Sequence, residues 1–411
     1  MPEFLRLQTP ADALARLLDA LPREAALGAV TIPTQEALGR ILAEDLHAPH
    51  PLPPFSRASV DGYAVRAADT YGASASLPAY LRLSGEVLMG KVTKLEVAQG
   101  TAAVVHTGGM IPSGADAVVM VEDTQVARPG EIEVLHPAAL GENVLQLGED
   151  VQAGEAVLLR GSRLRAQEVG GLMALGFTRV RVVRAPRVAI LSTGDEVVAP
   201  DMDPLPGQVR DVNTYTLAAV VTQAGGEPVR FGVLPDERAA LEAAAREAHA
   251  TCDAVLITAG SSVSSRDITS EVIAGLGPPG VLVHGVALKP GKPTILAVCA
   301  GKPVIGLPGN TVSALVVSGL FVAPLLRWML GCRPLLSPRV SARLTANVPS
   351  EAGREDYVPV RVSGEQGSYE AEPIFGKSNL IFTLVRADGL VRIPAEANGL
   401  AANTLVEVLL F

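Results

Sequence analysis

The sequence predicts a multidomain protein of the α/β plus β class, in which a doubly wound, mostly parallel α/β domain is joined to β-rich domains. The chain has 411 residues, more than one ordinary hydrophobic core organises. Between residues 187 and 330, short apolar runs alternate with helical patterns, as in a parallel sheet covered on both faces. On either side of this region, alternating apolar runs separated by Gly and Pro indicate strands.

The N-terminal part predicts helices followed by a hinge. Thr9 is a suitable N-cap, because Pro10 and apolar residues at helical spacing follow it. A second helix is expected over residues 35–42. The proline-rich stretch 49–54 favours extended backbone, so we place a boundary between domains there.

These patterns divide the chain into four domains. They are a discontinuous helical and mixed linker domain (1–50 and 141–183), a β-rich inserted domain (51–140), an α/β domain (184–331) and a small β-barrel-like C-terminal domain (332–411). In the α/β domain we expect strands at 187–191, 228–233, 253–258, 281–286, 294–298 and 304–305, and helices at 215–223, 236–250, 268–274 and 312–330. Elsewhere we expect a helix at 166–174 and strands at 118–121, 131–135, 340–344, 357–362 and 405–410.

Composition excludes several classes of function. The formal net charge of -9 provides no basic field for nucleic acid, so an anionic ligand must be held by local geometry. The apolar stretch 312–326 is shorter than the roughly 20 residues of a membrane span, which predicts a buried helix. No signal peptide is expected, and three widely separated cysteines fit a reducing cytoplasm. Neither nucleic acid nor a membrane is expected as a partner.

Loops rich in Gly, Ser, Asp and Lys follow the strands of the α/β region, at residues 192–196, 258–267, 289–293 and 306–310. Ligands of open α/β sheets bind at the carboxyl ends of the strands. Backbone N–H groups of such turns donate to phosphate oxygens, which predicts a phosphorylated ligand. Lys289 and Lys292 flank Pro290 and Gly291 and would clamp an oxyanion; the alternative is a solvated turn. A P-loop is excluded, because Pro293 follows Lys292.

Carboxylates at the same edge suit a magnesium ion. The carboxylates that follow strand ends are Asp195, Glu196, Asp236 and Asp267, and Mg²⁺ needs few protein oxygens because waters and phosphates complete its octahedron. The alternative for Asp236 and Asp267 is capping of the helices that begin beside them. For Asp61, which precedes Gly62, the alternative is a β-turn.

Several segments together resemble the MoeA family of molybdopterin molybdenumtransferases, to which the gephyrin E domain is related. They are Pro54–Arg66, His106–Glu122, Gly148–Val151, Leu191–Glu196, Lys289–Pro293 and Gly306–Asn310, spread along nearly the whole chain. The resemblance implies an elongated homodimer whose active cleft lies between the α/β domain of one subunit and the β-rich domain of the other. It implies Mg²⁺-assisted insertion of molybdenum from molybdate into adenylylated molybdopterin, with release of AMP.

The resemblance also implies residue roles. The implied catalytic residues are Asp61, Thr107, Asp236, Asp267, Lys289 and Lys292, and the implied metal ligands are Glu196 and Asp267. The implied molybdopterin-binding residues are Ser192, Thr193, Gly194, Gly260, Ser261, Ser262, Pro290, Gly291, Pro308, Gly309, Asn310 and Ser378. Asp61 would come from the partner subunit. A molybdopterin adenylyltransferase and molybdoenzyme chaperones are expected as further partners.

The chain departs from the family pattern at a few positions. Ala259 and Ser264 replace glycines, and each added Cβ restricts positive φ or close ligand approach. Thr311 replaces a proline but still permits a helix to start. The changes at Ala259 and Ser264 leave open a non-catalytic scaffold or carrier that binds molybdopterin. A molybdopterin adenylyltransferase is a second alternative, because single-domain relatives share the α/β module, although the extra domains and Asp61 argue against it.

Overall fold

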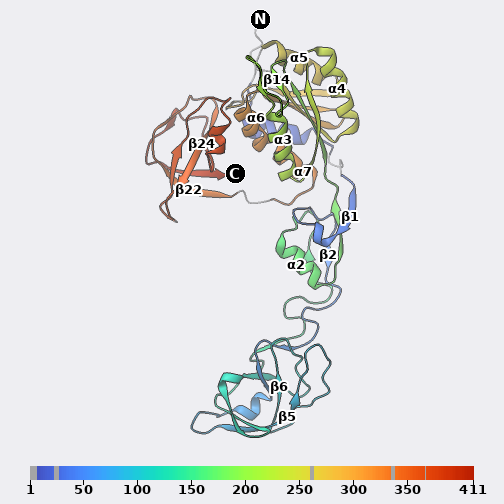
Figure 1. Ribbon diagram of the computed structural model, residues 1–411, viewed down its shortest axis with the longest axis vertical. Coiled ribbons are helices and arrows are strands. Elements are labelled where there is room, and N and C mark those ends of the chain that lie inside the picture. The colour runs from blue at the N-terminus through green and yellow to red at the C-terminus, as the bar shows by residue number, and fades with distance from the viewer. Residues whose placement is uncertain (1–6, 23–26, 260–262, 335–337, 366) are drawn as a thin grey trace.

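The computed structural model describes residues 7–22, 27–259, 263–334, 338–365 and 367–411, and it describes no side chains within 259–267. The molecule is elongated (Figure 1). The α/β domain and the C-terminal domain lie side by side at one end, the small linker domain lies in the middle, and the inserted β-rich domain lies at the far end.

The α/β domain is built on a six-stranded sheet of order β16-β13-β17-β21-β20-β18. Its strands are β16 (Glu227–Leu234), β13 (Arg187–Thr193), β17 (Ala254–Ala259), β21 (Lys302–Pro308), β20 (Ile295–Cys299) and β18 (Pro279–His284). The pairs β13–β16, β13–β17 and β17–β21 are parallel, whereas β20 is antiparallel to both β21 and β18. The expected mostly parallel sheet is therefore confirmed, with β20 as the reversed strand.

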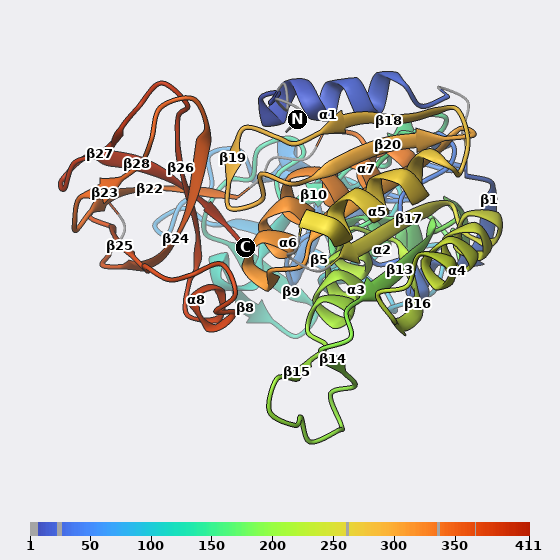
Figure 2. The same ribbon diagram turned by 90° about the horizontal axis from the view of Figure 1, so that it is seen from above.

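Helices cover both faces of this sheet, because its strands are apolar on both sides. Val188 and Ile190 of β13 pack with α3 (Asn213–Gln223), α6 (Thr311–Val317) and α7 (Ala323–Met329). Ala189 and Leu191 of the same strand pack with α4 (Arg238–Thr251) and α5 (Val263–Ala274) on the opposite face. Figure 2 shows the two helical layers. The expected doubly wound architecture is confirmed.

The N-terminal helix α1 (Pro10–Asp19) packs on the α/β sheet. Thr9 caps it as expected, with the Asp12 N–H donating to the Thr9 hydroxyl at 3.2 Å. Ala13 and Leu17 are fully buried in the same core as β13 and α3. The segment 1–50, expected in the linker domain, thus places its first helix against the α/β domain.

The linker domain contains α2 (Ala166–Ala174), with the predicted bounds, and short two-stranded pairings. These join β1 (Ala29–Pro33) to β12 (Arg179–Val183) and β2 (Leu46–His47) to β11 (Ala156–Leu158). The helix expected over 35–42 is wrong: only a 3₁₀ turn, Thr34–Glu36, forms. Gly39 follows at φ +77°, and Leu42 N–H then bonds to the Ser162 carbonyl at 2.9 Å, so pairing with a distant segment replaces the helix.

The inserted domain contains a six-stranded sheet of order β7-β4-β6-β5-β9-β8. Its strands are β7 (Ala117–Met120), β4 (Gly62–Val65), β6 (Thr101–Val105), β5 (Ala79–Glu86), β9 (Glu131–Val134) and β8 (Thr124–Arg128), and β3 (Arg57–Ala58) pairs separately with β10 (Val144–Leu145). Neighbouring residues of β4 enter different apolar clusters, Ala64 one and Val65 the other. The predicted β-rich character of this region is confirmed.

The C-terminal domain is a closed barrel, as expected. Its strands β24 (Glu355–Ser363), β25 (Glu370–Pro373), β22 (Arg339–Leu344), β28 (Leu405–Leu410) and β26 (Gly389–Ile393) pair in this order, and β26 pairs back with β24. Strand β19 (Leu288–Lys289) of the α/β domain adds to the barrel by parallel pairing with β24. The barrel is therefore joined through its backbone to the loop that contains Lys289.

The helical segment Thr311–Met329 is long and apolar enough to cross a membrane by length and composition alone, and 61% of its most apolar window is buried inside the protein. A π-helical turn, Ser318–Val322, lies between α6 and α7. Phe321 and Leu325 are fully buried against the sheet. The segment is a core helix of the α/β domain, as predicted.

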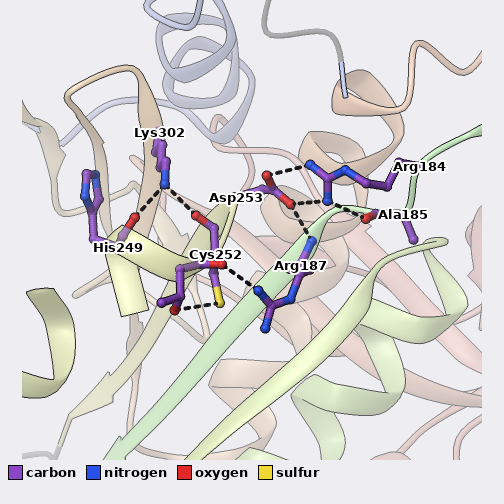
Figure 3. Close-up of polar contacts among 8 residues, drawn as sticks. Arg184, Ala185, Arg187, His249, Cys252, Asp253 and Lys302 are labelled. Carbon is purple, nitrogen blue, oxygen red and sulfur yellow. Dashed lines mark hydrogen bonds and ion pairs between the residues drawn. The ribbon is translucent and has the colours of Figure 1, made fainter. Parts of the chain in front are cut away.

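A polar cluster closes the amino edge of the sheet, where β13, β17 and β21 begin (Figure 3). Arg184 donates two hydrogen bonds of 2.9 Å to the carboxylate of Asp253, and the Arg187 N–H donates a third at 2.7 Å. Lys302 donates to the carbonyls of His249 and Cys252 at the end of α4, at 2.6 and 2.8 Å. Desolvation raises the pKa of Asp253, but its hydrogen bonds outweigh this effect and the pKa lies below the usual value.

Candidate functional site

The carboxyl edge of the α/β sheet gathers the predicted loops. Because β16, β13, β17 and β21 are parallel, these strands end at the same edge, at residues 234, 193, 259 and 308. Strand β18 runs in the same direction, so the loop 285–294 that returns to β20 joins them. Gly260, Ser261 and Ser262 lie outside the described residues, as do the side chains of Ala259, Ser264 and Asp267.

The end of β13 is held by buried hydroxyl groups. Ser192 Oγ lies 2.8 Å from Thr214 Oγ1 on α3, and Thr258 Oγ1 of β17 donates to Ser192 Oγ at 3.0 Å. All three side chains are buried. Ser192 therefore fixes the strand end, which positions the residues that follow it.

The position of Gly194 leaves no room for a side chain. It has φ +150°, and a Cβ there would lie 2.8 Å from Val197 Cγ2 and 2.9 Å from Glu196 Oε2. The exposed Glu196 thus folds back over the Gly194 backbone. The short pairing of β14 (Val197–Val198) with β15 (Val209–Arg210) follows this turn directly.

Asp236 does not cap α4, so the alternative of helix capping for this residue is wrong. The helix begins at Arg238, its N-cap is Glu237, and no side chain accepts a hydrogen bond at the cap. Asp236 is instead exposed, with its N–H donating to Asp195 Oδ1 at 3.1 Å. It lines a small pocket together with Thr193, Pro235, Glu237, Leu241, Ile268 and Thr269.

The capping alternative for Asp267 is also wrong, because α5 begins at Val263 and Asp267 lies inside the helix. Its carboxylate is outside the described side chains, so its expected pairing with Glu196 is not placed. Among the described residues, no group of three His, Cys, Asp or Glu side chains could hold a metal ion. Glu196 and Asp236 are exposed at this edge, as are the neighbouring carboxylates of Asp195 and Glu237.

The Lys289 loop is compact and tied to the barrel. Gly291 has φ +119°, and a Cβ there would overlap Val317 Cγ2 and lie 2.8 Å from Leu288 Cδ1. Lys289 Nζ lies 3.7 Å from Asp356 Oδ2 of the C-terminal barrel. Lys292 is exposed. Sequence reasoning missed Asp356, because nothing local relates it to a loop in another domain.

The loop after β21 is held from two directions. Asn310 Nδ2 donates to Ser378 Oγ at 2.9 Å, so the structure brings Ser378 of the C-terminal domain to this loop. Asn213, at the start of α3, donates to the Gly309 carbonyl at 2.8 Å. Asn213 was also missed, although its place near the amino end of a helix at the ligand edge is a usable signal. Thr311 begins α6, as its residue type permits.

Asp61 and Thr107 meet in the inserted domain. Thr107 donates its backbone N–H and its hydroxyl to Asp61 Oδ1, at 2.7 and 3.1 Å. The backbone hydrogen bond, followed by the hydroxyl, lowers the pKa of Asp61. His106 Nδ1 lies 3.9 Å from the same oxygen, and His106 Nε2 lies 3.0 Å from Glu86 Oε1. The cluster is exposed and keeps an ionised carboxylate at the surface.

A single chain does not bring this cluster to the α/β edge. The inserted domain, with β5 and β6, lies at the opposite end of the molecule from α3 and α6 (Figure 1). Lys289, Lys292, Glu196 and Asp236 therefore share one edge, whereas Asp61 and Thr107 share another surface.

Comparisons with known proteins cover nearly the whole chain. Family models match it over residues 8–176 (MoeA N-terminal region, domain I and II), 189–328 (Probable molybdopterin binding domain) and 341–411 (MoeA C-terminal region, domain IV). The molybdopterin molybdenumtransferase of Bacillus subtilis is 34% identical over 382 residues, covering 92% of this chain and 88% of that protein. The Nostoc enzyme of the same name is 35% identical over 364 residues, covering 87% and 83%.

Solved structures agree with these matches. A crystal structure of the molybdopterin biosynthesis MoeA protein from Pyrococcus horikoshii has a TM-score of 0.86 to this chain, at 35% identity, and covers 99% of this chain and 100% of its own. The similarity thus includes the inserted domain and the barrel as well as the α/β domain. The chain belongs to the MoeA family, the molybdopterin molybdenumtransferases of molybdenum cofactor biosynthesis.

Proposed function

We propose that the carboxyl edge of the α/β sheet binds adenylylated molybdopterin and molybdate, transfers molybdenum to the dithiolene and releases AMP. The observation that supports this site best is the strand topology, which places the loops of β13, β16, β18 and β21 together. Both substrates are anions, and the net charge of the chain is -9, so local donors must attract them.

Lys289, Lys292 and Asp236 have separate chemical roles in the proposal. Lys289 and Lys292 would hold phosphate and molybdate oxygens as point charges, supported by backbone N–H groups of the Gly291 and Gly309 turns. Asp236, beside the pocket at the end of β13, would orient the substrate or accept a proton from it. This arrangement stabilises charge that develops on the phosphoanhydride as AMP leaves.

Magnesium is the metal ion that we propose for this edge, with Glu196 and Asp267 as its protein ligands. Glu196 presents an exposed carboxylate at the turn after β13, and Asp267 follows in the first turns of α5. Hard carboxylate oxygens suit Mg²⁺, whose remaining positions waters and phosphates fill. Bound there, the ion would neutralise charge on the bridging phosphate oxygens.

Asp61 and Thr107 would reach the site from a second subunit. Two features support a homodimer: the distance of the inserted domain from the α/β edge, and the exposed apolar side chains Tyr80, Leu88 and Val92 on that domain. The ionised carboxylate of Asp61 would then face the substrate from the opposite wall of the cleft. We further propose a cytoplasmic protein that receives its substrate from a molybdopterin adenylyltransferase and passes its product to molybdoenzyme chaperones.

Release of AMP is the direct test of this function. Purified protein is mixed with adenylylated molybdopterin, molybdate and Mg²⁺, and AMP is measured by chromatography. We expect release that depends on both molybdate and the metal. Binding without release would indicate a carrier, and consumption of ATP with free molybdopterin would indicate an adenylyltransferase. Full cofactor-forming activity in both Asp61→Ala and Asp267→Ala would refute the assignment of residues.

Mixed dimers test the shared cleft. Asp61→Asn and Lys289→Gln are each expected to be nearly inactive, with both variants folded and dimeric. Random reassociation of the two should restore about a quarter of wild-type activity, because half of the dimers are mixed and each mixed dimer contains one intact site. No recovery, with mixed dimers demonstrated by tagged copies, would place both residues in the same subunit's site.

A further inference from the structure

We propose that Asp356 of the C-terminal barrel is a positioning residue for Lys289, so that the barrel helps to build the anion-binding edge of the α/β domain. This inference rests on the proposed function, because it concerns how that site holds its anionic substrate. It assigns to the barrel a part in ligand binding that goes beyond packing.

The backbone brings the two residues into register. Strands β19 and β24 pair in parallel, with Leu288 opposite Glu355 and Lys289 opposite Asp356. The Glu355 N–H donates to the Ala287 carbonyl at 2.9 Å, which anchors the loop one residue before β19. The Lys289 ammonium then lies 3.7 Å from Asp356 Oδ2. A rigid ladder therefore sets the starting position of the flexible lysine side chain.

The burial of Asp356 makes this contact specific. Only 3% of Asp356 is exposed, and a buried carboxylate needs cationic or hydrogen-bonding partners. Arg354 Nε binds Oδ1 at 3.0 Å, which leaves Oδ2 directed to Lys289. On the neighbouring strand β26, the residue opposite Asp356 is the apolar Ile393. Arg354 and Lys289 are thus the described charges that face this carboxylate.

Lys289 remains available to a ligand. Its side chain is 59% exposed although its ammonium lies near Asp356, so a ligand in the solvent can still reach it. A free lysine samples many rotamers, and holding it in one of them has an entropic cost. The carboxylate selects among these rotamers before the substrate arrives, which lowers the cost of binding.

A purely structural role for Asp356 predicts the opposite change in substrate affinity. If Asp356 served only to fold the barrel, its removal would leave Lys289 more cationic at a site for anions, and substrate affinity would stay unchanged or increase. The direction of the change in affinity therefore separates a positioning role from a structural one.

The test compares KM and kcat for adenylylated molybdopterin, and its Kd by calorimetry, in full-length dimeric variants. We expect Asp356→Asn to raise KM and Kd about tenfold with kcat within about twofold. Glu355→Gln is the matched control, because Glu355 is the neighbouring residue and bonds Tyr357 and Arg392 instead. Its KM should stay within about twofold of the wild type.

A double-mutant cycle decides whether Asp356 acts through Lys289. Asp356→Asn combined with Lys289→Gln should bind no more weakly than Lys289→Gln alone, whereas additive losses would overturn the inference. Wild-type or tighter affinity in folded Asp356→Asn would also overturn it. If Lys289→Gln itself binds normally, the proposed site fails, and this result is distinct from failure of the inference alone.

A second variant allows the same test if Asp356→Asn alone does not fold. Arg354→Gln with Asp356→Asn keeps a neutral hydrogen-bonding pair in the barrel wall and removes the carboxylate that faces Lys289. Thermal unfolding establishes that this variant is folded. It should show the same rise of about tenfold in KM, and an unchanged KM would refute the positioning role.

Discussion

At the amino edge of the α/β sheet, charged groups are held by ion pairs or by hydrogen bonds within the protein, whereas at the carboxyl edge comparable groups face solvent. Arg184, Asp253 and Lys302 each make multiple close contacts (Figure 3). Glu196, Asp236 and Lys292 make no ion pair within the part of the chain that the structure describes. The same strands thus begin beside charged side chains that have partners within the protein and stabilise the fold. They end beside charged side chains that are exposed and accessible to a ligand.

The largest expected effect is on stability at the amino edge. Asp253→Ala leaves Arg184 without its two-pronged partner and the Arg187 N–H without an acceptor, so we expect a loss of about 3 kcal/mol in the free energy of unfolding. Urea denaturation measures it. Activity per folded molecule should not change; a loss of AMP release in the folded variant would show that the two edges are coupled.

At the carboxyl edge we expect a substitution to lower activity and to leave stability nearly unchanged. Glu196→Gln should lower kcat/KM for AMP release by about a hundredfold, because in the proposed site this carboxylate holds the magnesium ion beside the reacting phosphates. Its free energy of unfolding should stay within about 0.5 kcal/mol of the wild type, since Glu196 is exposed. Steady-state kinetics and denaturation of the same preparation check both. A stability loss comparable to that of Asp253→Ala would remove the distinction between the edges.

A smaller effect is expected at the end of α4. Lys302 donates to the carbonyls of His249 and Cys252, where a cation also complements the helix dipole. Lys302→Met keeps the length of the side chain and should cost about 1 kcal/mol of stability. Arg246→Met, on the exposed face of the same helix, is the control and should be nearly neutral. Equal effects of the two substitutions would argue against a specific role for Lys302.

The pH dependence sharpens the comparison further. The pKa of Asp253 is lower in the folded protein than its unfolded value of about 3.9, so its contribution to stability is complete above that value. The contribution disappears as the pH falls through the folded pKa. The stability difference between wild type and Asp253→Asn should therefore be full near about pH 7 and shrink as the pH approaches about 3. A difference that grows on acidification would contradict the assigned ion pair.

Local patterns predicted most secondary structure, because their physical causes lie within a few neighbouring residues. The buried strand 187–191 and the capped helix after Thr9 depend on hydrophobic spacing and on one side chain. One error occurred where a distant partner competes, because Leu42 bonds to Ser162 in place of helical neighbours. Another concerned a helix boundary, since α5 begins at Val263, before Asp267.

The sequence by itself determined the order of strands and helices, the polar loops at the strand ends and the family resemblance, since each depends on residue type and spacing along the chain. Tertiary structure alone decided which groups meet. It placed α1 on the α/β sheet, Asn213 against Gly309, and Asp356 beside Lys289, and it separated Asp61 from the α/β edge of the same chain. Such contacts join segments from different elements, and only the topology and packing of those elements bring them together.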